Sequence, residues 1–376
     1  MHGLPPTTEQ TQAYVLDDRP DAWERLIDEL LASPRYGERW GRHWLDVARY
    51  SDSNGMDEDI AHPEAWRYRD YVIRSFNQDK GFDDFIVEQI AGDLLPNDSL
   101  EQRRDQVAGL GFLSVGPKML ACDDPDKMRR DIVDEQLDTT GRAFMGMTLG
   151  CARCHDHKFD PISIEDYYGL AGIFLSTKTL TKYTVVAHYH QYDLTDPEVA
   201  DRWKEIAGLE KKRGDKKTPE EEKKALGERI AELKKDLPPK HRVMGVTEDT
   251  VANTKVHLRG NYMTLGEEVP RRVLPVIEGF DQPAMPSKQS GRLEFARWIA
   301  SEEHPLTARV IVNRLWRWHF GRGLVPTPDN FGVLGELPSH PELLDHLALM
   351  LMEEGWSLKA MHREIMRSAT YRQGSR

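Results

Sequence analysis

The sequence predicts a mainly α-helical protein with two helical domains, separated by a charged helical hairpin and a small β element. In residues 1–180 and 286–376, apolar residues recur three and four positions apart, which is the spacing of one helix face. Residues 197–236 are instead dominated by Lys and Glu. Of nine tryptophans, all but Trp203 lie in the first 70 or the last 80 residues. This distribution indicates two packed ends and a more solvated middle.

The first domain, residues 1–180, is expected to be a succession of helices. We expect them at residues 20–31, 36–50, 64–78, 82–91, 126–150 and 163–176. The last of these opens on Ser163 and Asp166, which have the spacing of a capping box. The helix over 126–150 would bring the chain to Cys151.

The rest of the chain divides into a linker, residues 181–285, and a second helical domain, residues 286–376. In the linker, Gly214 and Pro219 interrupt the charged segment and predict two exposed helices joined by a turn. Residues 241–249 and 254–262 have the β-branched, alternating pattern of short strands. In the second domain we expect four helices in two pairs. One pair is divided near His304 and the other at Gly355, after which Ser357 can act as an N-cap.

Composition narrows the classes of function. A net charge of -12 argues against a nucleic-acid binder, which would normally be basic. The sequence has no apolar run near the roughly 18 residues of a membrane span, and its start, MHGLPPTTEQ, lacks the features of a secretory signal. Three cysteines are too few for a disulfide framework. Because the sequence opens on a Pro-rich turn and stops soon after a helix, we expect it to be a piece of a longer chain.

The segment GCARCHDHKFDP, residues 150–161, concentrates reactive side chains. Cys151, Cys154 and His155 match C-x-x-C-H, the attachment pattern of c-type haem. Two thiols three positions apart lie on one side of a helical turn and can add to the two vinyl groups of one haem, while the next histidine reaches the iron. The pattern predicts haem c, with thioethers at Cys151 and Cys154 and with His155 as the proximal ligand. Met145, Met147, His188 and His190 are candidates for a sixth ligand.

Two alternatives to haem remain open for the same segment. His155, His157 and Asp160, with one or both thiolates, offer the ligand types of a non-haem Zn, Fe or Ca site, which includes the case of a hydrolytic metalloenzyme. The cluster can instead be structural, in a non-catalytic module of a cell-surface assembly. Whether the chain is an enzyme stays open.

A second set of chemically active residues lies near the end of the chain. Arg314, Trp316, Trp318 and His319 fall within six positions of one expected helix. Their spacing favours a core stripe with a charged rim over a binding site.

Long segments of the chain resemble a known pair of families. RYGERWGRHWLDVARYSDSNG, WRYRDYVIRSFNQDKGFDDFIVEQIAGDLLP and GCARCHDHKFDPIS are similar to the planctomycete family termed domain of unknown function 1549. SGRLEFARWIASEEHPLTARVIVNRLWRWHFGRGLVPTPDNFGVLGELPSHPELLDHLA resembles its usual partner, domain of unknown function 1553.

This resemblance implies a cellular location more than a biochemical activity. Such proteins are typically large and exported, and often begin with a planctomycete cytochrome c module. That module and an export signal are absent from this sequence, so it resembles a truncated member. The resemblance favours haem c, a periplasmic or cell-surface location, and a redox partner or surface assembly as the binding partner.

Overall fold

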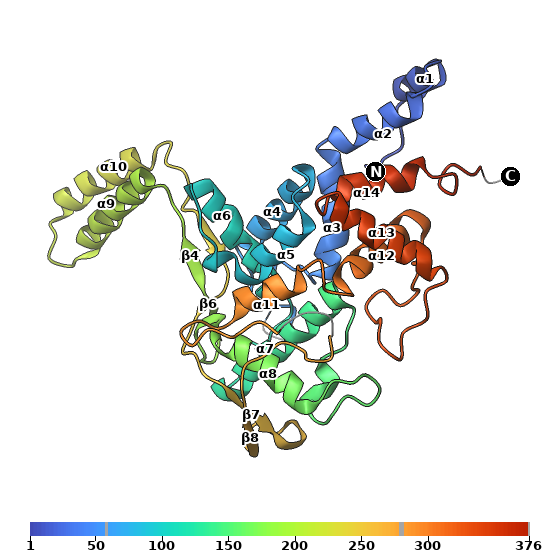
Figure 1. Ribbon diagram of the computed structural model, residues 1–376. Coiled ribbons are helices and arrows are strands. Elements are labelled where there is room, and N and C mark those ends of the chain that lie inside the picture. The colour runs from blue at the N-terminus through green and yellow to red at the C-terminus, as the bar shows by residue number, and fades with distance from the viewer. Residues whose placement is uncertain (57–58, 278–281, 375–376) are drawn as a thin grey trace.

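The computed structural model describes residues 1–56, 59–277 and 282–374 and confirms the mainly α-helical class. Figure 1 shows a helical body from which the α9–α10 pair projects on one side and α1 on another. In the first half of the chain the α-helices are α1 (Thr8–Val15), α2 (Ala22–Ala32), α3 (Arg35–Val47), α4 (Ala65–Asn77), α5 (Phe82–Ala91), α6 (Leu100–Gly109), α7 (Pro125–Thr140) and α8 (Ile164–Leu175). Short 3₁₀ turns, η1 (Gly92–Leu94) and η2 (Leu110–Leu113), follow α5 and α6.

Local sequence explains where α8 begins and how α3 packs in the core. Ser163 and Asp166 form the expected capping box of α8, each side chain accepting the other's backbone N–H. Helix α3 packs closely on α4 because a Cβ at Gly37 would lie 2.4 Å from the carbonyl oxygen of Ile73. Trp44, fully buried, then fills the core behind α3.

The helix expected over 126–150 is wrong in its last ten residues. α7 ends at Thr140, a π-helical turn η3 (Gly141–Met145) follows, and the 3₁₀ turn η4 (Gly150–Arg153) carries Cys151. The break occurs because Gly146 takes a left-handed φ of 59°, and a Cβ there would lie 2.7 Å from the ring of Phe331. Helices α1 and α6 are further elements that the sequence patterns do not predict.

The expected charged hairpin is present as α9 (Pro197–Gly214) and α10 (Glu220–Lys234). It has a small apolar seam of its own, made by Ile206, Ile230 and Leu233, and ion pairs such as Lys234 to Glu210 at 2.7 Å join its two helices. The hairpin leaves the body from β4 (Gln191–Asp193) and returns in β5 (Arg242–Met244), which pair antiparallel. It is therefore an insertion between two strands of one ladder.

The small β element consists of four antiparallel two-stranded sheets in the described residues. Besides β4–β5, they pair β1 (Thr177–Lys178) with β6 (Thr247–Glu248), β2 (Leu180–Lys182) with β3 (His188–Tyr189), and β7 (Thr254–His257) with β8 (Leu265–Val269). The short 3₁₀ turn η5 (Leu258–Gly260) lies in the β7–β8 connection.

The last part of the chain has the two expected helix pairs, α11 (Arg292–Ile299) with α12 (Thr307–Phe320), and α13 (Pro341–Glu353) with α14 (Leu358–Arg367). Ser357 caps α14 by accepting the N–H of Ala360. One continuous hydrophobic core runs from Ile27 in α2 to Met366 in α14. The first and last parts of the chain are thus packed together.

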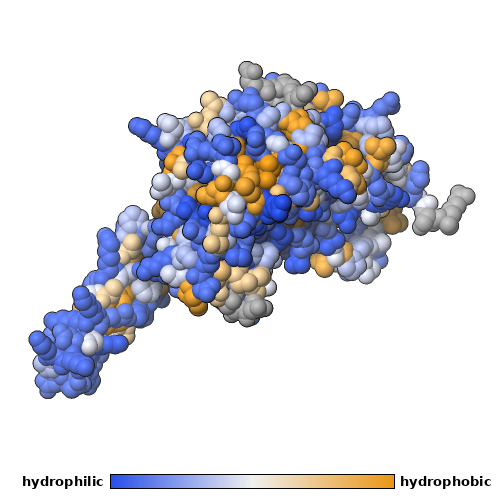
Figure 2. Space-filling view, turned by 90° about the horizontal axis from the view of Figure 1, so that it is seen from below, coloured by the Kyte–Doolittle hydropathy of each residue, from blue (hydrophilic) through white to orange (hydrophobic). Residues whose placement is uncertain are grey.

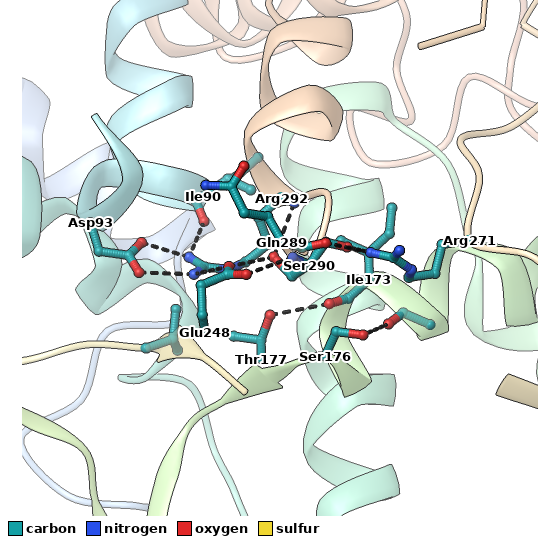
Figure 3. Close-up of polar contacts among 12 residues, drawn as sticks. Ile90, Asp93, Ile173, Ser176, Thr177, Glu248, Arg271, Gln289, Ser290 and Arg292 are labelled. Carbon is teal, nitrogen blue, oxygen red and sulfur yellow. Dashed lines mark hydrogen bonds and ion pairs between the residues drawn. The ribbon is translucent and has the colours of Figure 1, made fainter. Parts of the chain in front are cut away.

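Buried ion pairs reinforce this contact (Figure 3). Arg292, fully buried at the start of α11, donates from Nη1 to Asp93 Oδ1 at 2.8 Å and from Nη2 to Glu248 Oε1 at 3.0 Å. Glu248 also accepts from Ser290 Oγ at 2.6 Å. One guanidinium therefore ties η1, β6 and α11 together. Within residues 1–56, 59–277 and 282–374, no helix combines the length and the apolar character needed to cross a membrane.

Candidate functional site

The Cys-x-x-Cys-His segment lies on the 3₁₀ turn η4, between α7 and α8. Arg153, the variable residue before Cys154, points back to α7, where its Nη1 contacts Asp134 Oδ2 at 3.0 Å and its Nη2 contacts Asp131 Oδ1 at 2.8 Å. Burial alone would lower the pKa of Arg153, but these carboxylates raise it above its ordinary value. On the other side, Tyr168 of α8 donates to the carbonyl oxygen of Arg153 at 2.9 Å. Both neighbouring helices thus hold the turn in place.

The two thiols are free and exposed. Cys154 lies against the β7–β8 connection, where a Cβ at Gly260 would come within 2.5 Å of its Sγ atom. Ala152, between the thiols and fully buried, anchors the turn in the core. The third cysteine, Cys122, packs beside a separate small cluster with Leu120 and Met128. The turn is therefore rigid where it meets the body and open where it carries sulfur.

His155 is exposed, and its Nδ1 lies 2.7 Å from the carbonyl oxygen of Asp156. A carbonyl can only accept, so Nδ1 is the donor in this contact. Asp156 is itself fixed, because its Oδ1 accepts the N–H of Ile164 at 2.8 Å at the start of α8. A histidine whose Nδ1–H is held by a backbone carbonyl presents Nε2 as a metal ligand.

His157 and Asp160 have different roles from His155. His157 Nδ1 accepts the backbone N–H of Asp160 at 2.8 Å, and its Nε2 lies 3.3 Å from Thr148 Oγ1. The ring is therefore the neutral Nε2–H tautomer, with both nitrogens engaged. Asp160 Oδ1 accepts the N–H of Val333 at 2.7 Å, which attaches the segment to the loop after α12. These two side chains shape the turn and its contact with the last part of the chain.

The expected metal set is consequently not gathered. His157 and Asp160 lie together, with Nδ1 3.5 Å from Oδ2, and both are engaged by backbone N–H groups, whereas His155 faces solvent apart from them. Across residues 1–56, 59–277 and 282–374, no three His, Cys, Asp or Glu side chains are grouped so that they could hold a metal ion. Among the sixth-ligand candidates, Met145 and Met147 are buried in the main core, whereas His188 is exposed on β3 and His190 is half-buried.

Apolar side chains are exposed on both sides of the turn. Phe159 belongs to the segment, and Val333 and Leu334 follow the backbone contact with Asp160, with exposed fractions of 42%, 67% and 60%. Leu258 and Met263 lie in the β7–β8 connection that approaches Cys154. β7 and β8 are at the bottom of Figure 1, and Figure 2, viewed from that side, shows hydrophobic surface on this face.

The turn carries the types of group that covalent attachment of a haem would use. Both thiols are free, the adjacent imidazole presents Nε2, and exposed apolar side chains flank the turn. Because thiols and imidazole face solvent, a porphyrin here would lie against the surface of the protein.

Comparison with known proteins gives two matches. Residues 1–179 match the family model described as a protein of unknown function (DUF1549), and residues 291–376 match the one described as a protein of unknown function (DUF1553). No curated protein and no solved structure matches the chain. The α9–α10 hairpin lies between the two matched segments.

Proposed function

Because the chain belongs to the paired families of unknown function DUF1549 and DUF1553, whose descriptions name no activity, we propose a function from the geometry of residues 150–161. Cys151 and Cys154 would hold one haem through thioethers and His155 would ligate its iron, and the bound haem would give the chain a role in electron transfer. Maturation of such a haem places the protein in the periplasm or at the cell surface.

The observation that carries this proposal is the contact of His155 with the backbone. Its Nδ1 lies 2.7 Å from the carbonyl oxygen of Asp156, which leaves Nε2 as the ring nitrogen that faces away from this contact. Free thiols at Cys151 and Cys154 support the same interpretation.

The protein's own residues would supply position and orientation. The ion pairs of Arg153 to Asp131 and Asp134 hold the turn against α7, and the carbonyl of Asp156 keeps the imidazole in one tautomer. When bound, a haem supplies one-electron redox chemistry. Since the turn faces solvent, the edge of such a haem would be open to a redox partner. The flanking apolar side chains would form part of the contact with that partner.

The test is covalent haem in the full chain expressed together with the c-type haem maturation machinery. We expect a Soret band that survives acid-acetone extraction and a pyridine haemochrome. Cys151→Ala and Cys154→Ala should each leave a single thioether, which shifts the haemochrome band, and the double variant should lose covalent haem.

Cys122→Ala is the matched control, because this half-buried thiol is remote in sequence from the turn and should leave haem incorporation unchanged. A folded wild-type chain without covalent haem, made in cells that load a reference cytochrome c, would contradict the proposal. So would equal incorporation in the wild type and in the double variant.

A further inference from the structure

A cleft of about 680 Å³ lies between the two family segments. Helices α3 and α7 and the π-helical turn η3 line one side, and α12 with the loop after it lines the other. This volume is within the range of small-molecule sites, and such sites favour the junction of two packed segments. A π-helical turn in the wall is also frequent at functional sites.

Four arginine side chains line this cleft, two from each segment: Arg49, Arg142, Arg314 and Arg317. They stand out in a chain whose net charge is -12. Guanidinium groups bind carboxylate, phosphate and sulfate through paired hydrogen bonds. The lining therefore suits a ligand that carries an oxyanion.

The two arginines of α12 have different tasks. Arg314 is buried and donates to the carbonyl oxygens of Arg142 and Ala143 and to Asp329 Oδ1, the last at 2.9 Å. Its guanidinium is used to join α12 to the π-helical turn. Arg317 is exposed and, within the described part of the chain, has no side-chain hydrogen bond or ion pair. Arg317 thus has its full donor capacity free.

Arg49 and Arg142, the two arginines of the first segment, each keep part of their hydrogen-bond donor capacity free. Arg142 donates from Nε to Asp138 Oδ2 at 2.8 Å, and no described partner engages its two terminal nitrogens. Arg49 donates from Nη2 to Glu135 Oε1 at 2.5 Å, while its Nε is buried without a hydrogen-bond partner among the described residues. Arg49 also holds a left-handed φ of 56°, which is a strained conformation for a non-glycine residue. Strain of this kind clusters at ligand sites.

None of the acids that line the cleft pairs with Arg317. Asp138 pairs with Arg142 through Nε alone, Asp46 pairs with Arg42 outside the lining at 3.1 Å, and Asp329 pairs with the buried Arg314. Part of the wall is apolar, because His43 stacks on Trp318 with ring centroids 4.8 Å apart and an angle of 14°. Burial, with the nearby charge of Arg39, lowers the pKa of His43 to about 4, so this ring is neutral at pH 7.

We propose that this cleft binds the oxyanion group of a small organic molecule, with Arg317 and Arg142 as its principal contacts and the His43–Trp318 pair beside its non-polar part. The carboxylate, phosphate and sulfate forms share this chemistry. The site is independent of the haem proposal, because it uses none of Cys151, Cys154 and His155.

The test is isothermal titration calorimetry of the full chain with sodium sulfate, sodium phosphate and sodium benzoate, each at ionic strength matched with sodium chloride. We expect saturable binding of at least one probe, and the probe that binds best identifies the headgroup. Arg317→Gln should raise its dissociation constant about tenfold, the loss of one charge-assisted contact. The Cys151→Ala/Cys154→Ala double variant should bind like the wild type.

Arg297→Gln is the matched control, because Arg297 is exposed on α11, lies outside the cleft lining and forms no ion pair among the described residues. It removes the same charge and should leave the dissociation constant unchanged. Thermal unfolding without ligand checks that both variants are folded. The proposal is overturned if no probe shows saturable binding to the wild type, or if Arg317→Gln binds as tightly as Arg297→Gln.

Discussion

The turn at residues 150–161 and the arginine-lined cleft are assembled in different ways. The turn takes its reactive groups from twelve consecutive residues and is held mainly by α7 and α8 of the same family segment, with one hydrogen bond from Val333 of the second segment to Asp160. The cleft joins Arg49 and Arg142 to Arg317, so it exists only where the two family segments are packed together. A disturbance of the packing should therefore reach the cleft first, while a disturbance of the turn should leave the cleft intact.

The largest effect is expected when the buried ion pairs between the segments are broken. In Arg292→Met, the carboxylates of Asp93 and Glu248 lose their buried partner, and we expect a loss of about 3–5 kcal/mol in the free energy of unfolding. Urea denaturation followed by circular dichroism measures it. At urea concentrations near the midpoint of unfolding, sulfate or benzoate binding should be lost before the turn at residues 150–161, which the ion pairs of Arg153 hold, becomes disordered.

Arg297→Met on the same helix is the control for this variant. Its side chain is exposed, so the change in unfolding free energy should stay within about 0.5 kcal/mol. If Arg292→Met is as stable as Arg297→Met, the contact between the segments does not depend on these ion pairs. The expectation that disturbed packing affects the cleft before the turn would then lose its main support.

A smaller loss of stability is expected at low pH, again at the contact between the segments. His319 of α12 lies 2.9 Å from His362 of α14, from Nε2 to Nδ1, and the Trp40 ring of α3 packs on His362. Burial lowers the pKa of His362 well below its ordinary value and that of His319 to about 4, helped by the Met1 amine and His43. The unfolded chain binds more protons below pH 6.5, so stability should fall as pH decreases from 6.5 towards 4.

At pH 5 this linkage amounts to about 2 kcal/mol for His319 relative to pH 7. Urea midpoints at the two pH values measure it in the wild type, and His319→Gln should show a smaller difference between them. His346 on α13, for which no contact with this pair is present in the described residues, provides the control His346→Gln. An equal pH dependence in all three proteins would contradict the assignment to His319.

The sequence predicted the local features well and the distant ones poorly. The capping box at Ser163 and the charged hairpin each depend on neighbouring residues, and both occur where the pattern indicated. The helix expected over 126–150 ends at Thr140, and the chain turns at Gly146, where the ring of Phe331, far along the chain, leaves no room for a Cβ.

The cleft shows more strongly that sequence patterns do not predict contacts between residues far apart in the chain. Arg314, Trp316, Trp318 and His319 were expected to be a core stripe with a charged rim, and Arg314 is indeed buried. Trp318, however, lines the cleft and stacks on His43. Helical spacing in α12 says which face points inward, but it carries no information on which residues of α3 and α7 stand opposite. Only the packing of the two segments brings those side chains together.

The smallest effect is expected from a change aimed at the turn alone. In Gly260→Ala, the new Cβ would meet Cys154 Sγ at 2.5 Å, and φ at this position is +73°. We expect a loss of about 1–2 kcal/mol from strain in the left-handed region together with displacement of the β7–β8 connection. The displaced connection should also leave the already exposed Cys154 less covered, so that its reaction with a thiol reagent becomes faster than in the wild type.

Gly208→Ala is the matched control, because a Cβ at Gly208 in the middle of α9 meets no atom within 4 Å. It should raise stability by roughly 0.5–1 kcal/mol, the helix preference of alanine over glycine. Mass spectrometry after brief labelling separates Cys154 from Cys151, whose rate should change little. Since the change at Gly260 lies outside the cleft, anion binding should persist in Gly260→Ala, and its loss would show that turn and cleft are coupled rather than separate.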